Sequence, residues 1–305
     1  MRKKPYTKLL FAHLEGRSFR SLAAENNVSA PTIYRYCRQG LKELPPCIDV
    51  TRKYCNRFCG QLLVDGKFVG VRGYQKKIPV IYGIDYLSHD IPHYLLTRAE
   101  NYQSCLTFFQ SLRLANYPLQ AVICDENTNI YEACRYIYPD VVVQLCQNHY
   151  KENVRSLLEV RKEGTNPRHI LFMQILEKLF AKKRSKEELT IIAGRMVKEF
   201  SDEPLLLRIL AELERKELLL FGYQYLKGIP TTTNLIECYN SHLQGRLETI
   251  KGFESFQHAD LWLNGYFLKR RTKKFTDCEG KFRHLNGKTS LSKTLMAGID
   301  TPIFF

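Results

Sequence analysis

Five short apolar runs between residues 61 and 145 constrain the fold of this chain more than any other feature of the sequence. They occupy residues 62–64 with a continuation at 68–71, and residues 78–84, 93–97, 121–124 and 141–145. Short turns separate the first three runs, whereas helical patterns starting at Asn101 and near residue 128 precede the last two. The sequence therefore predicts an α/β fold with a mixed five-stranded sheet, in which an antiparallel meander gains a parallel extension.

Asp65 and Asp125 each end one of these runs, and a further acid lies at a predicted helix start. Asp65 follows the first run, and Asp125 follows the fully apolar fourth run. Glu237 lies three residues after Asn234, which is a good N-cap for a helix that begins with apolar residues. We hypothesise that these three carboxylates, far apart in the sequence, meet around divalent metal.

Each motif also has a simpler interpretation that the sequence leaves open. Asp-Gly at residue 65 is a favoured hairpin turn, and an acid such as Asp125 often caps the helix that follows a strand. Asn-x-x-Glu ending at Glu237 is also a capping box, whose carboxylate satisfies only a backbone N–H. Cys146 and His149 follow the fifth run; they could help to hold a metal, or be a buried thiol and a backbone-bonded imidazole.

Residues 150–228 change to helical periodicity and are predicted to be a helical insertion in the sheet domain. A capping box at Ser185 and Glu188 marks one of its helices. The last helices of the core are expected over residues 229–276. Five basic residues near the end of this segment suit a surface that follows a DNA backbone: Lys269, Arg270, Arg271, Lys273 and Lys274.

The first 44 residues have the pattern of an all-α helix-turn-helix domain. Ser18 and Ser29 are predicted to cap the second and third helices, with Ile33 and Tyr36 facing inward on the third. The outward side of that helix would then meet base edges and phosphates with four residues: Thr32, Tyr34, Arg35 and Arg38. The alternative is a small helical unit used only for packing or dimerisation.

The net charge of +15 and the pI near 9.3 favour a polyanionic partner. No apolar run approaches the roughly 20 residues that span a bilayer, and residues 1–6 lack the apolar segment of a secretory signal. The ten cysteines are irregularly spaced, which favours reduced thiols and a cytoplasmic, nucleoid-associated protein. Residues 45–60 are expected to be a linker. It contains Cys47, Cys55 and Cys59, and because these form no second close pair, zinc is not expected.

The order of these motifs resembles DDE transposases of the Mutator-like (MULE) type and their bacterial insertion-sequence relatives. The matching residues, within about 60–275, are Asp65, Asp125, Cys146 with His149, and Thr233-Asn234 with Glu237 and Asn240. The resemblance implies an RNase H-like core in which Asp65, Asp125 and Glu237 hold two Mg²⁺ ions, with Mn²⁺ as a substitute. It implies hydrolysis at transposon ends and strand transfer into target DNA, by a homo-oligomer bound to terminal repeats.

This resemblance also gives the expected domain organisation. The segments are a helix-turn-helix domain at 1–44, a linker at 45–60, core at 61–149, insertion at 150–228, core at 229–276 and an unassigned tail at 277–305. Two other functions remain open: a domesticated, inactive DNA-binding regulator, and a structure-selective nuclease that cuts without joining.

Overall fold

A mixed five-stranded sheet forms the centre of the computed structural model, which describes residues 6–250 and 252–305. The sheet order is β3-β2-β1-β4-β5, in which β1 pairs antiparallel with β2 and parallel with β4. β2 pairs antiparallel with β3, and β4 pairs parallel with β5. The predicted mixed sheet is therefore confirmed, with these bounds: β1 Gln61–Val69, β2 Ile78–Asp85, β3 Tyr94–Leu96, β4 Ala121–Cys124 and β5 Val142–Leu145.

β1 does not end at Asp65. Its ladder with β2 runs without interruption from Leu62 opposite Asp85 to Val69 opposite Ile78, and Asp65 pairs with Tyr82 inside it. The hairpin turn at Asp65 is therefore wrong, and so is the expectation that this acid closes the first strand. The ladder continues because β2 is long enough to satisfy the backbone of β1 on both sides of the acid.

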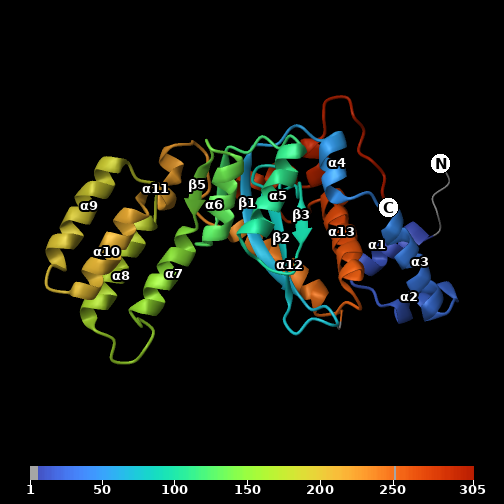
Figure 1. Cartoon of the computed structure of the whole chain (residues 1–305), viewed down its shortest axis with the longest axis horizontal. Coiled ribbons are helices and arrows are strands. Elements are labelled where there is room, and N and C mark those ends of the chain that lie inside the picture. The colour runs from blue at the N-terminus through green and yellow to red at the C-terminus, as the bar shows by residue number, and fades with distance from the viewer. Residues whose placement is uncertain (1–5, 251) are drawn as a thin grey trace.

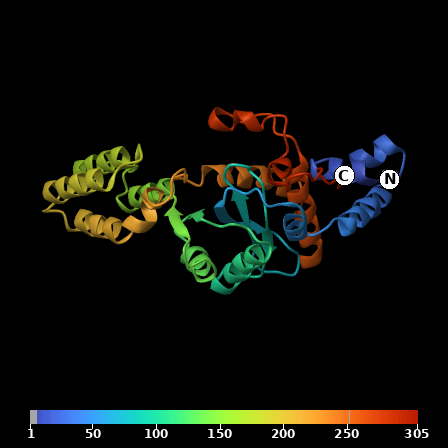
Figure 2. The same cartoon turned by 90° about the horizontal axis from the view of Figure 1, so that it is seen from above.

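Helices cover both faces of the sheet. Figure 2 shows α5 (Tyr102–Leu114) and α6 (Thr128–Ile137) on one face, and α12 (Asn234–Leu247) on the other. Phe108 and Phe109 of α5 are fully buried beneath the sheet. α13 (Phe256–Thr272) contributes Trp262 and Phe267 to the same core.

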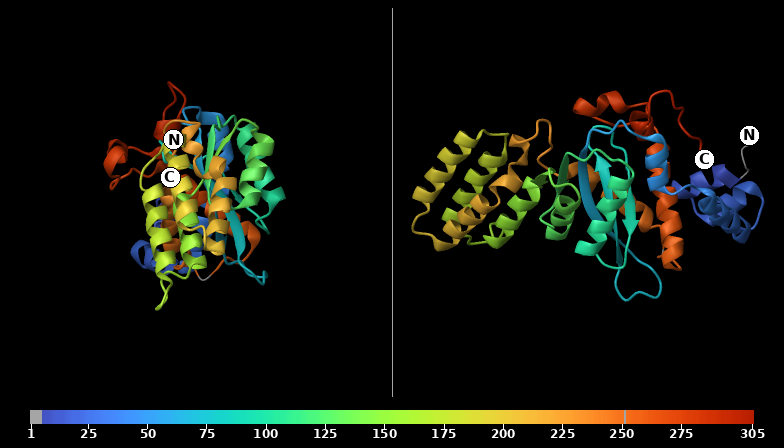
Figure 3. Two further views of the ribbon diagram at one scale, coloured as in Figure 1. Left: turned by 90° about the vertical axis from the view of Figure 1, so that its left-hand side faces the viewer. Right: turned by 45° about the horizontal axis from the view of Figure 1, so that its top comes forward.

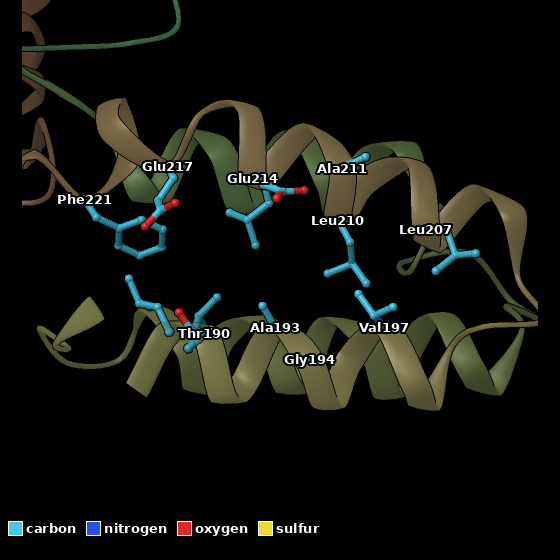
Figure 4. Close-up of a pocket in the computed structure, with 13 residues that line it drawn as sticks. Thr190, Ala193, Gly194, Val197, Leu207, Leu210, Ala211, Glu214, Glu217 and Phe221 are labelled. Atoms are coloured by element: carbon cyan, nitrogen blue, oxygen red, sulfur yellow. The ribbon is translucent and has the colours of Figure 1, made fainter. Parts of the chain in front are cut away.

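The region expected as an insertion is helical and lies at one end of the molecule (Figure 1). Its elements are α7 (Gln147–Leu157), α8 (Pro167–Phe180), α9 (Lys186–Glu199), α10 (Pro204–Arg215), α11 (Glu217–Leu220) and η1 (Gly222–Gln224). The capping box at Ser185 and Glu188 is confirmed. A pocket of about 510 Å³ between α9 and α10 is lined mainly by apolar side chains, with Glu214 and Glu217 at its rim (Figure 4).

Three helices at the opposite end form the N-terminal unit: α1 (Tyr6–Leu14), α2 (Phe19–Asn26) and α3 (Ala30–Glu43) (Figure 3). The hydroxyls of Ser18 and Ser29 accept N–H groups of α2 and α3, as predicted. Tyr36 was predicted to face inward, but it is 42% exposed. Cys37, four residues after Ile33, fills that inner face instead. Residues 1–5 of the expected domain lie outside the described residues.

Residues 45–60 are not a simple linker, because they contain α4 (Cys47–Tyr54). α4 packs against Arg271, whose guanidinium donates to Asp90 at 2.9 and 2.8 Å and to Thr51 Oγ1 at 2.9 Å. Both members of the Arg271–Asp90 ion pair are fully buried. The C-terminal region joins this network through α14 (Ser290–Thr294), because the hydroxyls of Ser290 and Thr294 donate to Asp90. A short 3-10 helix, η2 (Gly280–Leu285), precedes α14.

No helix in the described part of the chain is both long and apolar enough to cross a membrane.

Candidate active site

Strands β1 and β4 bring Asp65 and Asp125 to the same edge of the sheet. The parallel pairing of these strands ends at Leu63 opposite Ile123, and each acid lies two residues beyond that pair. Burial and, next, the charge of Asp125 raise the pKa of Asp65 to about 6. Burial also raises the pKa of Asp125, and Glu237 adds to that rise. The two carboxylates therefore interact, and Glu237 belongs to the same cluster.

Glu237 reaches the cluster from the first turn of α12. The carbonyl of Thr233 accepts the first helical hydrogen bond from the Glu237 N–H at 3.1 Å, so Thr233, and not Asn234, is the N-cap. Glu237 Oε1 accepts from the Thr233 hydroxyl at 2.7 Å, and no side chain caps the helix. The capping-box interpretation is therefore wrong, because the carboxylate faces the other acids and not a backbone N–H.

Thr233 and His149 connect Asp125 with Glu237. The Thr233 hydroxyl lies 3.2 Å from Asp125 Oδ1 as well as 2.7 Å from Glu237 Oε1, and with one proton it donates to one of them at a time. His149 Nδ1 lies 2.7 Å from Asp125 Oδ1 and 3.8 Å from Glu237 Oε1. The expectation of a backbone-bonded histidine is therefore wrong: this imidazole contacts carboxylates.

Cys146 is buried, as one of the two interpretations expected, and its sulfur accepts the Thr233 N–H at 3.3 Å. One ligand atom from each of Asp125, Cys146 and His149 lies within 4.8 Å of the others. Within residues 6–250 and 252–305, this is the one group of three or more His, Cys, Asp or Glu side chains close enough to hold a metal ion. A hydrogen bond of 2.9 Å from the Gln147 N–H to the Thr231 carbonyl lies beside it. The chain thus enters the helical insertion and returns from it at the same point.

Asn240, one turn after Glu237 on α12, orients Asp65. Its amide donates to Asp65 Oδ2 at 2.5 Å, and the Gly66 N–H donates to Oδ1 at 2.7 Å. The Tyr82 hydroxyl donates to Asn240 Oδ1 at 2.9 Å, which fixes the amide with its NH₂ group toward the acid. A single helix thereby contacts all three carboxylates, directly or through one intermediate.

Glu100 is a fourth acid at this site that the sequence pattern did not reveal. It lies between β3 and α5, where no motif marks it, and its Oε1 accepts from Asn127 at 2.6 Å. A Cβ atom at Gly66 would lie 2.6 Å from Glu100 Oε2, so this glycine permits the close approach. Burial raises the pKa of Glu100, and the charge of Asp125 adds to the rise. Asn234, a matched motif residue, is exposed and accepts from Asn148 at 3.0 Å.

The structure corrects the predicted basic DNA-binding surface near the end of α13. Arg271 is fully buried against Asp90, and Lys269 is 3% exposed and paired with Glu15. Neither can reach DNA in this conformation. Lys273 also pairs with Glu15, at 2.9 Å, but it keeps 41% of its side chain exposed. Arg270 lies over the ring of Tyr239, and Lys274 is exposed.

The predicted recognition residues on α3 differ in their surroundings. Arg35 and Arg38 are exposed, as expected. Thr32 is half-buried beside its N-cap Ser29, with its Oγ1 2.9 Å from the Ser29 hydroxyl. Tyr34 is half-buried, and its hydroxyl donates to Glu254 at 3.2 Å, a contact that ties the N-terminal unit to the segment before α13.

The fold and the site together define a protein with a mixed α/β sheet that gathers acidic residues at one edge. A family model described as "Transposase, Mutator family" matches residues 51–260, and the chain belongs to this family. Among solved structures, the Drosophila P element transposase strand transfer complex is similar over 88% of this chain and 92% of that chain, with 10% identity and a TM-score of 0.49. No curated protein matches the chain.

Proposed function

We propose that this member of the Mutator family is a metal-dependent DNA transposase that cuts transposon ends and transfers the freed 3′-hydroxyl into target DNA. The observation that carries the proposal is that α12 links the acids of β1 and β4 to Glu237: Asn240 binds Asp65, and the Thr233 hydroxyl contacts both Asp125 and Glu237. The family match of residues 51–260 includes all three acids.

The sheet topology supports an RNase H-like core made of residues 61–149 and 229–276. Three antiparallel strands precede two parallel strands, and the helices between β3, β4 and β5 pack on one face. In this proposal, residues 150–228 are a helical insertion in that core, and the N-terminal residues up to 44 are a helix-turn-helix unit. Arg35 and Arg38 supply its exposed cations for DNA.

The donor atoms at the site fit a hard divalent cation. The half-buried carboxylates of Asp65 and Asp125, whose pKa values are raised, become easier to ionise together when a cation lies between them. Mg²⁺ prefers oxygen ligands, and Mn²⁺ accepts the same set. Asp65, Asp125 and Glu237 would hold the metal. When bound, two such ions activate the attacking oxygen and stabilise the leaving oxygen of a phosphodiester.

Neighbouring side chains prepare these carboxylates for that role. Asn240 occupies one lone pair of Asp65 Oδ2, and Gly66 binds Oδ1, so both oxygens have fixed directions. The Thr233 hydroxyl holds Glu237 against the cluster. His149 binds Asp125 Oδ1 and leaves Oδ2 of the same carboxylate for a cation.

The proposal is tested by cleavage of duplexes that carry the element's terminal repeats, with Mg²⁺ and with Mn²⁺. Asp65→Asn, Asp125→Asn and Glu237→Gln are each expected to abolish cleavage while leaving DNA affinity nearly intact. Glu248→Gln is the matched control, because Glu248 is exposed at the C-cap of the same helix and, among the described residues, its carboxylate accepts a hydrogen bond only from Gln244. Normal cleavage by Glu237→Gln would refute the assigned role.

The same assay separates the other two functions. Pre-nicked ends that are joined to target DNA identify a transposase, whereas cutting without joining identifies a nuclease. DNA binding with no cleavage in either metal identifies an inactive regulator. The net charge of +15 suits all three, so only the reaction products distinguish them.

A further inference from the structure

A second, basic pocket lies farther along the helix that carries Glu237. It has a volume of about 420 Å³ and is bounded by α12, α13 and residues 274–277. Its lining includes five groups that are or can become cationic in addition to the buried Lys269: His242, Arg246, Arg270, Lys273 and Lys274. Asp277 is the one acid in the lining, so the pocket has a positive balance.

Most of this positive charge is not neutralised by the protein. Within the described ranges, no carboxylate pairs with Arg246, Arg270 or Lys274, although Lys273 pairs with Glu15. Arg270 also has a buried Nε with no hydrogen-bond partner among the described residues. Burial and, next, Arg270 lower the pKa of His242, with further contributions from Arg246 and Lys273. These observations describe a site that favours an anion.

The N-terminal unit contacts three residues that line this pocket: Arg246, Lys269 and Lys273. Gly16, at the end of α1, has a φ of +105°, and the Arg246 guanidinium lies where a side chain at residue 16 would be. Glu15 holds Lys269 and Lys273 from the adjacent position. Arg246 therefore has a fixed place between the N-terminal unit and α12.

We propose that this pocket binds a phosphodiester of the DNA strand that enters the acidic site. The inference rests on the proposed function, since it assigns the pocket to the same substrate. Arg246 follows Glu237 by nine residues, which corresponds to roughly 14 Å along an α-helix at about 1.5 Å per residue. Nine residues are also about two and a half helical turns, so Arg246 projects from the side of α12 opposite Glu237. Arg246 and Lys274 provide charge-assisted contacts.

The test measures DNA binding by the full chain as a function of salt, using fluorescence anisotropy with a terminal-repeat duplex. Each lost phosphate contact reduces the slope of log K against log salt by about 0.9. Lys274→Gln should reduce the slope by about 1, and the double variant Arg246→Gln/Lys274→Gln by about 2. The control is Lys198→Gln/Arg208→Gln, which removes two exposed cations of the helical insertion and should leave the slope unchanged.

Several outcomes would overturn the proposal. A slope equal to that of the control in both pocket variants removes the pocket from the DNA interface. Melting curves check the fold; if the double variant unfolds, the exposed Lys274→Gln alone decides the result. Inorganic phosphate provides a further arm: if it stabilises the wild type but not the pocket variants, while DNA slopes stay equal, the pocket is a free-phosphate site and not a DNA site.

Failure of the pocket and failure of the proposed function give different results. Binding is measured without cleavage, and the Asp65→Asn background should show the same loss of slope. If the pocket variants reduce the slope of log K against log salt but the wild type never cuts DNA, only the enzymatic proposal is refuted. If the pocket variants keep the wild-type slope and the wild type does cut DNA, only the role of the pocket in DNA binding is refuted.

Discussion

Replacing Asp65 by Asn should stabilise the metal-free protein near neutral pH while removing its activity. Burial, with the charge of Asp125, raises the pKa of Asp65 from its ordinary 3.8 to about 6 in the fold. A difference of about 2 units at about 1.4 kcal/mol each means that ionised Asp65 costs about 3 kcal/mol. Asn has one acceptor oxygen, so it keeps either the Gly66 or the Asn240 bond; the other is worth about 1 kcal/mol. The expected net gain is about 2 kcal/mol.

The pH dependence of this gain has a definite sign. The folded state binds the Asp65 proton more tightly than the unfolded state, so the stability of the wild type falls as pH rises from about 4 through about 6. The Asn variant lacks this proton. Its advantage should therefore be largest above pH 6 and shrink between pH 6 and 4, and below about 4 the variant should be less stable by the roughly 1 kcal/mol of the lost hydrogen bond.

Urea unfolding in EDTA, at a series of pH values, measures this difference directly. Glu248→Gln should show no comparable gain. Adding Mn²⁺ should reverse the order of stabilities, because the wild type gains free energy from metal binding and the variant loses a ligand. A variant that is less stable than the wild type at pH 7.5, or a gain that does not shrink below pH 6, would refute the reasoning.

Three further predictions concern the surrounding residues. Thr233→Val should lower the cleavage rate by about tenfold or more, since a hydrogen bond to a charged group is worth about 1.5–3 kcal/mol, and Thr233→Ser should restore it; equal rates for Val and Ser would contradict this. Arg271→Met should destabilise the fold by about 3–5 kcal/mol by leaving Asp90 buried and unpaired, and Asp90→Asn in the same chain should recover part of the loss in urea unfolding. Arg35→Ala and Arg38→Ala should weaken binding to terminal repeats, and unchanged affinity in a shift assay would remove α3 from the interface.

The elements of the fold were predictable where one local signal decided the outcome. Short apolar runs identified the strands. Ser18, Ser29 and Ser185 identified helix starts because their hydroxyls accept nearby N–H groups. The acids at 65, 125 and 237 were predicted from their positions next to such elements, and the structure brings them together. Their roles as metal ligands remain a prediction.

The errors came from partners that are distant in the sequence. Lys269 and Arg271 resemble surface cations until the fold places Glu15 and Asp90 beside them. Asp65 resembles a turn residue because only the length of β2 reveals that the strand continues. Glu100 has no local signal, since its relation to Asp125 exists only in three dimensions. Charge and spacing therefore predict which residues are available, but not which are already paired.

The hydrogen bonds between Gln147 and Thr231 and between Thr233 and Cys146 have a consequence for how this family can vary. They close the neck of the helical insertion beside the carboxylates, so the geometry of the neck is independent of the length of chain beyond it. Loop-closure entropy rises only slowly with length, by about 0.6 kcal/mol per doubling. Residues could be added in the exposed turn at 161–164 between α7 and α8 at little cost in loop-closure entropy, and the carboxylates beside the neck would keep their positions.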